Sequence, residues 1–194
     1  MPNRHERVST GIAVLNHIGR CVLWMIALWA GAEVRSQEIP PANDACFKGL
    51  AETAPSTEFT QLEGGAVVRH ERTGLEWQRC ALGQQWDAAS KTCAGRPTVH
   101  TWKEAVKQAE QTGDGWRLPT GDELMTIVER CHDGPAINPQ VFPNTPGVLF
   151  WSSSVDTGGV GRVWAVSFFT GQPFRVGTAQ NGRVRLVRGT IQGP

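Results

Sequence analysis

TWKEAVKQAEQTGDGWRLPTGDELMTIVERC (residues 101–131) contains the same helix start signal twice. Thr101 with Glu104, and Thr120 with Glu123, form Thr-x-x-Glu capping boxes, in which each side chain bonds the backbone N–H group of the other residue. Apolar residues then recur at i, i+3, i+4 and i+7, which is the spacing of one helix face. They are Trp102, Ala105, Val106 and Ala109 in the first copy, and Leu124, Ile127, Val128 and Cys131 in the second. The stretch therefore predicts two amphipathic helices.

Glycine and proline set the expected ends of these helices. Gly113 ends the first helix in this interpretation, and Gly134-Pro135 ends the second, so that Cys131 lies on a buried helix face. Pro119 restricts the residue before it to an extended conformation. We therefore expect a short buried strand or turn to lead into the second helix.

A hairpin is predicted before the helices. AVVRHERTGLEWQ (66–78) alternates apolar and polar residues around a turn at 72–74. Val68 and either Leu75 or Trp77 are expected to face the core.

Strands are also predicted after the helices, where four apolar runs follow one another. They are VLFWSSS (148–154), RVWAVSFF (162–169), PFRVG (173–177) and RVRLVR (183–188). The turn signal Gln180-Asn181-Gly182 predicts a tight hairpin between the last two runs. A hairpin, two helices and a second antiparallel sheet make the predicted fold class α+β.

The N-terminus has the pattern of a secretory signal. CVLWMIALWAGA (21–32) is an apolar run that follows basic residues, and it is shorter than the about 20 residues that span a bilayer. We expect cleavage after Ser36, with Ala32 as another possible site and a retained N-terminal anchor as the other interpretation. The predicted organisation is given by ranges: a signal peptide (1–36), a linker (37–57), a folded domain (58–190) and a tail (191–194).

Cysteine number agrees with export. The chain has five cysteines, and removal of the leader takes Cys21 and leaves an even number, which in an exported protein favours two disulfides. The remaining cysteines are Cys46, Cys80, Cys93 and Cys131. Three pairings are open. Cys80–Cys93 closes the shortest loop, and Cys46–Cys131 would then tie the N-terminal segment to the second helix.

Charge is balanced overall but uneven along the chain. The net charge of +1 speaks against a strongly basic nucleic-acid binder. Loss of residues 1–36 removes four basic and two acidic residues, so that 15 basic and 16 acidic residues remain. No acidic residue follows Asp156, whereas five arginines do: Arg162, Arg175, Arg183, Arg185 and Arg188.

Two interpretations of these arginines are open. They could form an anion-binding face, with Arg183, Arg185 and Arg175 on one strand face. Alternatively, they could be scaffold residues that pair with the acidic residues of the two helices, which is the preferred interpretation.

Tryptophan is a second candidate for ligand contact. Five of the six tryptophans after the leader lie in apolar runs and are expected in the core: Trp77, Trp102, Trp116, Trp151 and Trp164. Trp86 lies in the loop that a Cys80–Cys93 bond would close, and it is the candidate for an exposed stacking residue.

Several motifs together resemble the Lcl C-terminal domain family, which is named after a collagen-like bacterial adhesin. They occur in family order over about residues 58–190: TGLEWQRC (73–80), TWKEAV (101–106), GWRLPTGDEL (115–124), INPQVFP (137–143), FWSSS (150–154), WAVSFFTG (164–171) and VRLVRG (184–189). The resemblance implies a fold similar to C-type lectins and formylglycine-generating enzymes, with two helices packed on twisted antiparallel sheets.

Motifs for catalysis and metal binding are missing from the sequence. No G-x-S-x-G elbow surrounds Ser152–Ser154, and GGVG (158–161) lacks the lysine and helix of a phosphate loop. The sequence has no C-x-x-C motif and no zinc-finger spacing of His70, His100 and His132. Calcium takes about six to eight oxygen ligands, and the acid-free C-terminal part offers no carboxylates. The late cysteines of formylglycine-generating enzymes are absent too, so we expect no enzyme, metal or cofactor.

The sequence thus favours an exported binding module without catalysis, acting in the periplasm, at the outer surface or as a secreted protein. We expect it to bind a protein or an anionic polysaccharide through loops 144–162 and 171–182, because rigid scaffolds display function on loops. The candidate ligand-binding residues are Trp86, Arg162, Arg175 and Arg183. The alternatives are an accessory subunit of a pilus or envelope assembly and, less favoured, an enzyme on the related fold.

Overall fold

The computed structural model describes residues 46–47, 49–132 and 134–191, which lie in one compact unit of the chain, Pro40–Pro194. The expected signal peptide (1–36) and most of the linker therefore lie outside the described residues, as does most of the tail. Within the described part of the chain, no helix is long and apolar enough to cross a membrane.

The first sheet has four antiparallel strands, in the order β1-β2-β3-β9. Its strands are β1 (Phe59–Leu62), β2 (Val67–His70), β3 (Glu76–Gln78) and β9 (Val187–Arg188), and the 3-10 turns η1 (Ser56–Glu58) and η2 (Glu63–Gly65) flank β1. β2 and β3 form the hairpin predicted for residues 66–78. Val68, Leu75 and Trp77 are all buried, as the alternating pattern requires.

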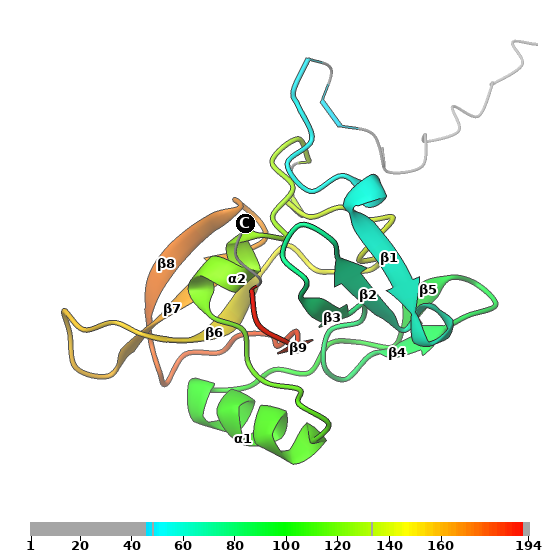
Figure 1. Ribbon diagram of the computed structural model, residues 1–194. Helices are drawn as coiled ribbons and strands as arrows, with labels where there is room; N and C mark the ends of the chain where they lie inside the picture. The colour runs from blue at the N-terminus through cyan, green and yellow to red at the C-terminus, as the bar shows by residue number, and fades with distance from the viewer. Residues whose placement is uncertain (1–45, 48, 133, 192–194) are drawn as a thin grey trace, which may run out of the picture. The chain divides into compact units, whose positions relative to one another are not determined.

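The second large sheet has three antiparallel strands in the order β6-β7-β8. They are β6 (Leu149–Val155), β7 (Arg162–Ser167) and β8 (Gln172–Gly177). A separate small hairpin, β4 (Gln85–Asp87) and β5 (Thr92–Ala94), lies in the loop after β3. Figure 1 shows the three-stranded sheet on one side of the domain and β1, β2 and β3 on the other.

Both predicted capping boxes are present. The backbone N–H of Thr101 donates to Glu104 Oε2 (2.8 Å) at the start of α1 (Trp102–Thr112). The backbone N–H of Thr120 donates to Glu123 Oε2 (2.8 Å) at the start of α2 (Gly121–Met125). The mixed α+β class with two helices and antiparallel sheets is therefore confirmed.

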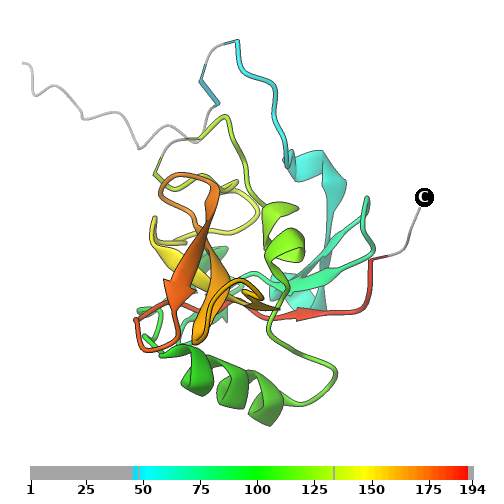
Figure 2. The same ribbon diagram turned by 90° about the vertical axis from the view of Figure 1, so that its left-hand side faces the viewer.

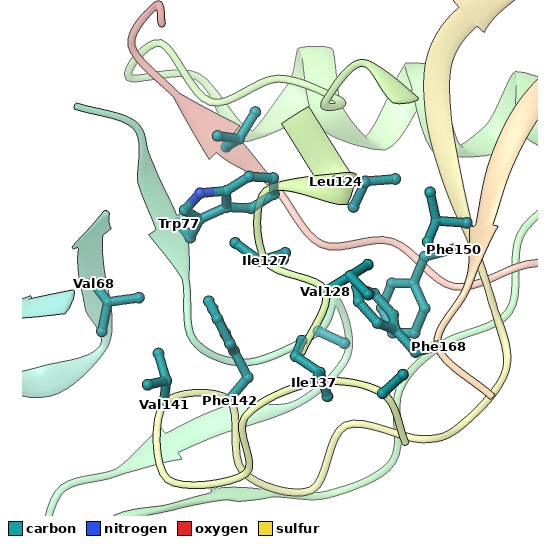
Figure 3. Close-up of a cluster of buried hydrophobic side chains, with 14 of the residues drawn as sticks. Val68, Trp77, Leu124, Ile127, Val128, Ile137, Val141, Phe142, Phe150 and Phe168 are labelled. Carbon is teal, nitrogen blue, oxygen red and sulfur yellow. The ribbon is translucent and has the colours of Figure 1, made fainter. Parts of the chain in front are cut away.

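Apolar side chains pack on both faces of the three-stranded sheet, mainly on β6 and β7. One cluster of apolar side chains joins this sheet, α2 and the first sheet, and its members include Val68, Trp77, Leu124, Ile127, Phe142, Phe150 and Phe168 (Figure 3). A second cluster lies on the α1 side and includes Ala105, Ala109, Trp151, Val163, Ala165, Val184 and Leu186. The two helices therefore cover opposite faces of the sheet.

The second helix is shorter than the sequence predicts. α2 ends at Met125, and Cys131 lies in a turn beyond it. The Thr126 hydroxyl donates to the Glu123 carbonyl oxygen (2.7 Å), and the β-branched side chains that follow disfavour further helix. The apolar spacing predicted burial correctly, because Leu124, Ile127, Val128 and Cys131 are all buried.

A buried carboxylate stabilises the turn that follows α2. Glu129 is fully buried and accepts hydrogen bonds from the backbone N–H groups of Thr53 (2.9 Å), Ala54 (2.8 Å) and Cys131 (3.1 Å). Burial acts to raise the pKa of Glu129, but these hydrogen bonds together outweigh it and lower the pKa. This contact fastens the N-terminal segment to the turn after α2.

The predicted hairpin between 173–177 and 183–188 is wrong. Within 183–188, only β9 is a strand, and it pairs with β3 instead of β8. The backbone at Arg183 bonds to the outer edge of β6, through Arg183 N–H to the Leu149 carbonyl (2.8 Å) and Trp151 N–H to the Arg183 carbonyl (2.9 Å). Gly182 permits this path, because a Cβ there would lie 2.8 Å from the Trp151 Nε1 atom.

In the described part of the chain, two disulfides are present, and they join Cys80 to Cys93 and Cys46 to Cys131. The first closes the loop that carries β4 and β5. The second ties the N-terminal segment to the turn after α2, not to a helix as the sequence suggested.

Candidate functional site

The five C-terminal arginines have different environments, and Arg185 is the most buried. Its guanidinium donates to the carbonyl oxygens of Gln78 (2.8 Å) and Arg79 and to the hydroxyl of Thr145 (2.6 Å), and it lies over the Phe142 ring. Burial, and secondly the charge of Arg79, lower the pKa of Arg185 to about 9. Arg185 therefore holds the loop before β6 against the end of β3 and is not available to a ligand.

Arg188 is also part of the scaffold. Its Nε lies 2.7 Å from Glu76 Oε2 and its Nη2 lies 2.6 Å from Glu63 Oε1, while its guanidinium covers the Trp116 ring at 4.5 Å. Both partners belong to the first sheet and its turn. The expectation that the C-terminal arginines pair with acidic residues of the helices is therefore wrong for Arg188. The acidic helix residue Glu123 bonds to Arg117 instead (2.6 Å).

Arg162 and Arg175 are exposed and adjacent at one end of the β7–β8 hairpin. The Arg162 Nη2 atom lies 3.5 Å from the Arg175 carbonyl oxygen, and the Arg175 guanidinium lies over the Trp164 ring at 4.9 Å. Trp164 and Arg175 are cross-strand partners, so they point to the same face of the sheet. Among the described residues, Arg162 has no ion pair.

Asp156 is the acidic residue next to this arginine pair. It is buried, its Oδ1 accepts the Gly158 N–H (3.0 Å), and its Oδ2 lies 3.8 Å from the Arg175 Nε. Asp156 thus shapes the turn after β6 and orients Arg175, whose side chain remains 55% exposed. Positive charge is therefore still available to a partner.

Arg183 does not join this pair. It is half-buried and pairs with Phe150 on β6, at the opposite edge of the three-stranded sheet from β8. The predicted common strand face of Arg175, Arg183 and Arg185 is therefore wrong, because the backbone of Arg183 bonds to β6 and Arg185 enters the core.

Trp86 belongs to a different part of the molecule. It is half-buried on β4, where its Nε1 donates to the Gly64 carbonyl (3.0 Å) and Arg79 lies 4.0 Å from its ring centroid. With Trp116 it lines a pocket of about 240 Å³ between η2, β3 and the loop after β3. The candidate residues thus separate into an arginine pair at β7–β8 and a tryptophan at the first sheet.

Exposed apolar side chains near the arginine pair were not predicted. Val155, Val160 and Phe174 are 59%, 104% and 44% exposed. Two sequence signals could have identified them: the glycines around Val160 indicate a projecting turn, and Pro173 indicates an edge strand, because proline cannot donate a ladder hydrogen bond.

A hydroxyl, an imidazole and a carboxylate lie in series beside the first hairpin, but the hydroxyl and the imidazole are buried. The Thr73 hydroxyl lies 3.0 Å from His70 Nδ1, and His70 Nε2 lies 3.2 Å from Glu58 Oε2. His70 is fully buried and stacks on Phe59, and Thr73 is also buried. A substrate therefore has no access to the hydroxyl. The contacts stabilise the turn of the hairpin instead.

The serines of β6 are likewise bonded to the scaffold. The Ser152 hydroxyl donates to the Trp164 carbonyl (2.5 Å) and the Ser153 hydroxyl to the Pro119 carbonyl (3.2 Å), while Ser154 Oγ accepts the Gly121 N–H (3.0 Å).

Cys46, Cys131 and His132 bring three potential metal ligands within 4.8 Å of one another. The two sulfur atoms are joined in a disulfide and are therefore not thiolate ligands.

The fold and this surface define a small disulfide-bonded α+β domain with an exposed cationic hairpin. The model of the Lcl C-terminal domain matches residues 66–188, and the chain belongs to this family. No curated protein sequence matches the chain.

Proposed function

We propose that the chain is an exported binding module without catalysis, which binds an acidic partner at the bacterial envelope or surface. The binding surface comprises loops 144–162 and 171–182 on a C-type-lectin-like scaffold. The observation that carries this proposal is the exposed pair Arg162 and Arg175, which the buried Asp156 neutralises only in part. Two disulfides in a small domain support export, because such bonds persist in oxidising compartments.

The surroundings of the arginine pair favour a protein over a polysaccharide. Val155, Val160 and Phe174 expose apolar side chains. Val160 lies in the turn two residues before Arg162, whereas Val155 and Phe174 pair with Val163 and Ala165 and so lie beside the arginines along the strands but on the other face of the sheet. Arginine combined with apolar and aromatic contact area is typical of protein interfaces. A protein partner also fits the alternative role as an accessory subunit of a pilus or envelope assembly. An enzyme on the related fold is less favoured, because the serine hydroxyls of β6 donate to backbone carbonyls.

Binding to defined probes tests the proposal. Immobilised protein is presented with a glutamate-rich peptide, heparin and neutral dextran at 50 and 150 mM NaCl. We expect salt-dependent binding of the peptide that R162E/R175E weakens about tenfold or more, since charge reversal replaces attraction by repulsion.

The double variant R96E/K107E is the matched control, because it makes the same charge change at two exposed residues outside the hairpin. Equal weakening by both variants, or no binding of any anionic probe, contradicts the proposal. Binding of heparin alone would replace the protein partner by an anionic polysaccharide.

A further inference from the structure

β8 is an open edge of the three-stranded sheet. The sheet order ends at β8, and four of its six residues, Gln172–Arg175, are exposed. Figure 2 shows β8 in orange in front of the sheet, with no other described strand or helix lying over it. The opposite edge differs, because β6 donates from Trp151 to the Arg183 carbonyl and from Ser153 to the Pro119 carbonyl.

The pairing with β7 determines which backbone groups of β8 point outward. Thr178 N–H donates to the Gly161 carbonyl (3.0 Å), which makes 161 and 178 a hydrogen-bonded pair. Hydrogen-bonded and non-bonded pairs alternate along an antiparallel ladder. The bonded pairs are therefore 163/176, 165/174 and 167/172 in the observed register, and residues 173, 175 and 177 direct their backbone groups away from β7.

These outward groups offer a short hydrogen-bonding edge. Pro173 has no N–H, which suits a position that does not serve the ladder, and the Gly177 carbonyl already accepts the Gln180 N–H (3.0 Å). The groups left for a partner are the Arg175 N–H, the Gly177 N–H and the Pro173 carbonyl. The Arg175 carbonyl lies 3.5 Å from the Arg162 Nη2 atom and keeps a second lone pair for a partner. An added strand can exchange two hydrogen bonds with Arg175 at its centre.

The side chains of β8 differ between its two faces. Arg175 lies on the face of Trp164 and next to Arg162, whereas Phe174 points to the opposite face and is 44% exposed. On an added strand, the residue opposite Arg175 lies on the cationic face, and its two neighbours lie on the face of Phe174.

We propose that β8 accepts an extended segment of a protein partner as a fourth strand of its sheet. The segment carries an acidic residue opposite Arg175 and apolar residues on either side of it, a mode of recognition in which main-chain hydrogen bonds give affinity and alternate side chains give specificity. This inference rests on the proposed function and names the partner and its mode of binding. A second copy of the chain fits less well, because symmetric pairing about Arg175 would place like charges opposite each other.

Amide hydrogen exchange measured by NMR tests strand addition on the folded chain. The probe is a capped seven-residue peptide of alternating valine and glutamate, and the control has the same composition in two blocks. At ten times its Kd, the alternating peptide is expected to slow exchange of the Arg175 and Gly177 amides about tenfold. The amides of Phe174 and Val176 bond to β7 and serve as internal references.

The outcomes separate the binding mode from the function. One outcome is that the peptide binds, that R162E/R175E weakens this binding, and that amide exchange at Arg175 and Gly177 stays unchanged. In that case strand addition is wrong, but the proposed binding function is retained. If neither peptide binds, both proposals fail for a protein partner. Protection of Arg175 and Gly177 without peptide that grows with protein concentration would replace the peptide by a second copy of the chain.

Discussion

The guanidinium of Arg175 lies 4.9 Å from the ring centroid of Trp164, its cross-strand partner on β7. This cation–π contact holds the arginine against the sheet while its side chain stays 55% exposed. A charged group that is oriented before binding loses less conformational entropy when a partner arrives. The relationship makes the β7–β8 hairpin a prepared cationic surface.

Asp156→Asn is expected to strengthen binding of acidic ligands. The amide keeps an oxygen for the Gly158 N–H but removes the negative charge that lies 3.8 Å from the Arg175 Nε. Affinity for the glutamate peptide should rise about two- to fivefold, because the ion pair is long and its arginine is exposed to solvent, which makes the pair weak. Isothermal titration calorimetry measures the change, and a decrease in affinity would show that Asp156 contributes by orienting Arg175 instead.

Arg185→Ala is expected to destabilise the domain strongly. The substitution leaves the carbonyl oxygens of Gln78 and Arg79 and the Thr145 hydroxyl without a donor, and it opens a cavity beside Phe142. Loss of such a buried network costs about 3–5 kcal/mol. Urea denaturation should show this loss, while Arg96→Ala, at an exposed loop position, stays within about 0.5 kcal/mol of wild type. Equal stability of the two variants would contradict a structural role for Arg185.

The two disulfides should contribute unequally to stability. Cys46 and Cys131 are 85 residues apart, and Cys80 and Cys93 are 13 apart. Because a longer closed loop restricts the unfolded chain more, C46A/C131A is expected to cost about 5 kcal/mol and C80A/C93A about 3 kcal/mol. Urea denaturation of the two double variants gives the order. The reverse order would contradict loop length as the main source of the stabilisation.

Stability is expected to fall as the pH drops below 6.5. Burial lowers the pKa of His70 from its ordinary value of 6.5, and the hydrogen bond to Glu58 offsets only part of this effect. The unfolded chain therefore takes up the proton first, so the contribution of neutral His70 is complete above pH 6.5 and is lost as the pH falls through the lowered pKa.

Urea midpoints between pH 7.5 and 5 measure this dependence. The carboxyl groups of Glu123 and Glu129, whose pKa values are lowered from 4.5, titrate below this window. His70→Gln should flatten the profile between pH 7.5 and 5, and an unchanged slope would assign the effect to another group.

Local signals predicted much of the fold. The capping boxes at Thr101 and Thr120 start both helices, and the alternation in residues 66–78 forms the β2–β3 hairpin. The periodicity after Leu124 predicted burial correctly but helix wrongly. The backbone N–H groups of Thr53 and Ala54 bond to Glu129 in the turn after α2. They lie more than 70 residues away in the sequence, so no local pattern indicates these bonds.

The site was predictable only in part. Counting charges identified the acid-free C-terminal part and with it Arg162 and Arg175. Which arginines are exposed depends on contacts distant in sequence, such as those of Arg185 with Gln78 and of Arg188 with Glu63. The open edge at β8 depends on the pairing of residues 183 and 187–188 with β6 and β3, which contradicts the local hairpin signal at 180–182.

A charge exchange between Arg175 and the peptide residue opposite it tests the central claim most directly. Dissociation constants are measured for wild type and R175E with two alternating peptides, one with glutamate and one with lysine at the central position. We predict that R175E weakens the glutamate peptide about tenfold and that the lysine peptide recovers most of this loss in R175E, because the pair is restored with its signs reversed. If R175E binds the glutamate peptide as tightly as wild type does, or if the lysine peptide gains nothing, Arg175 is not the contact that selects an acidic partner.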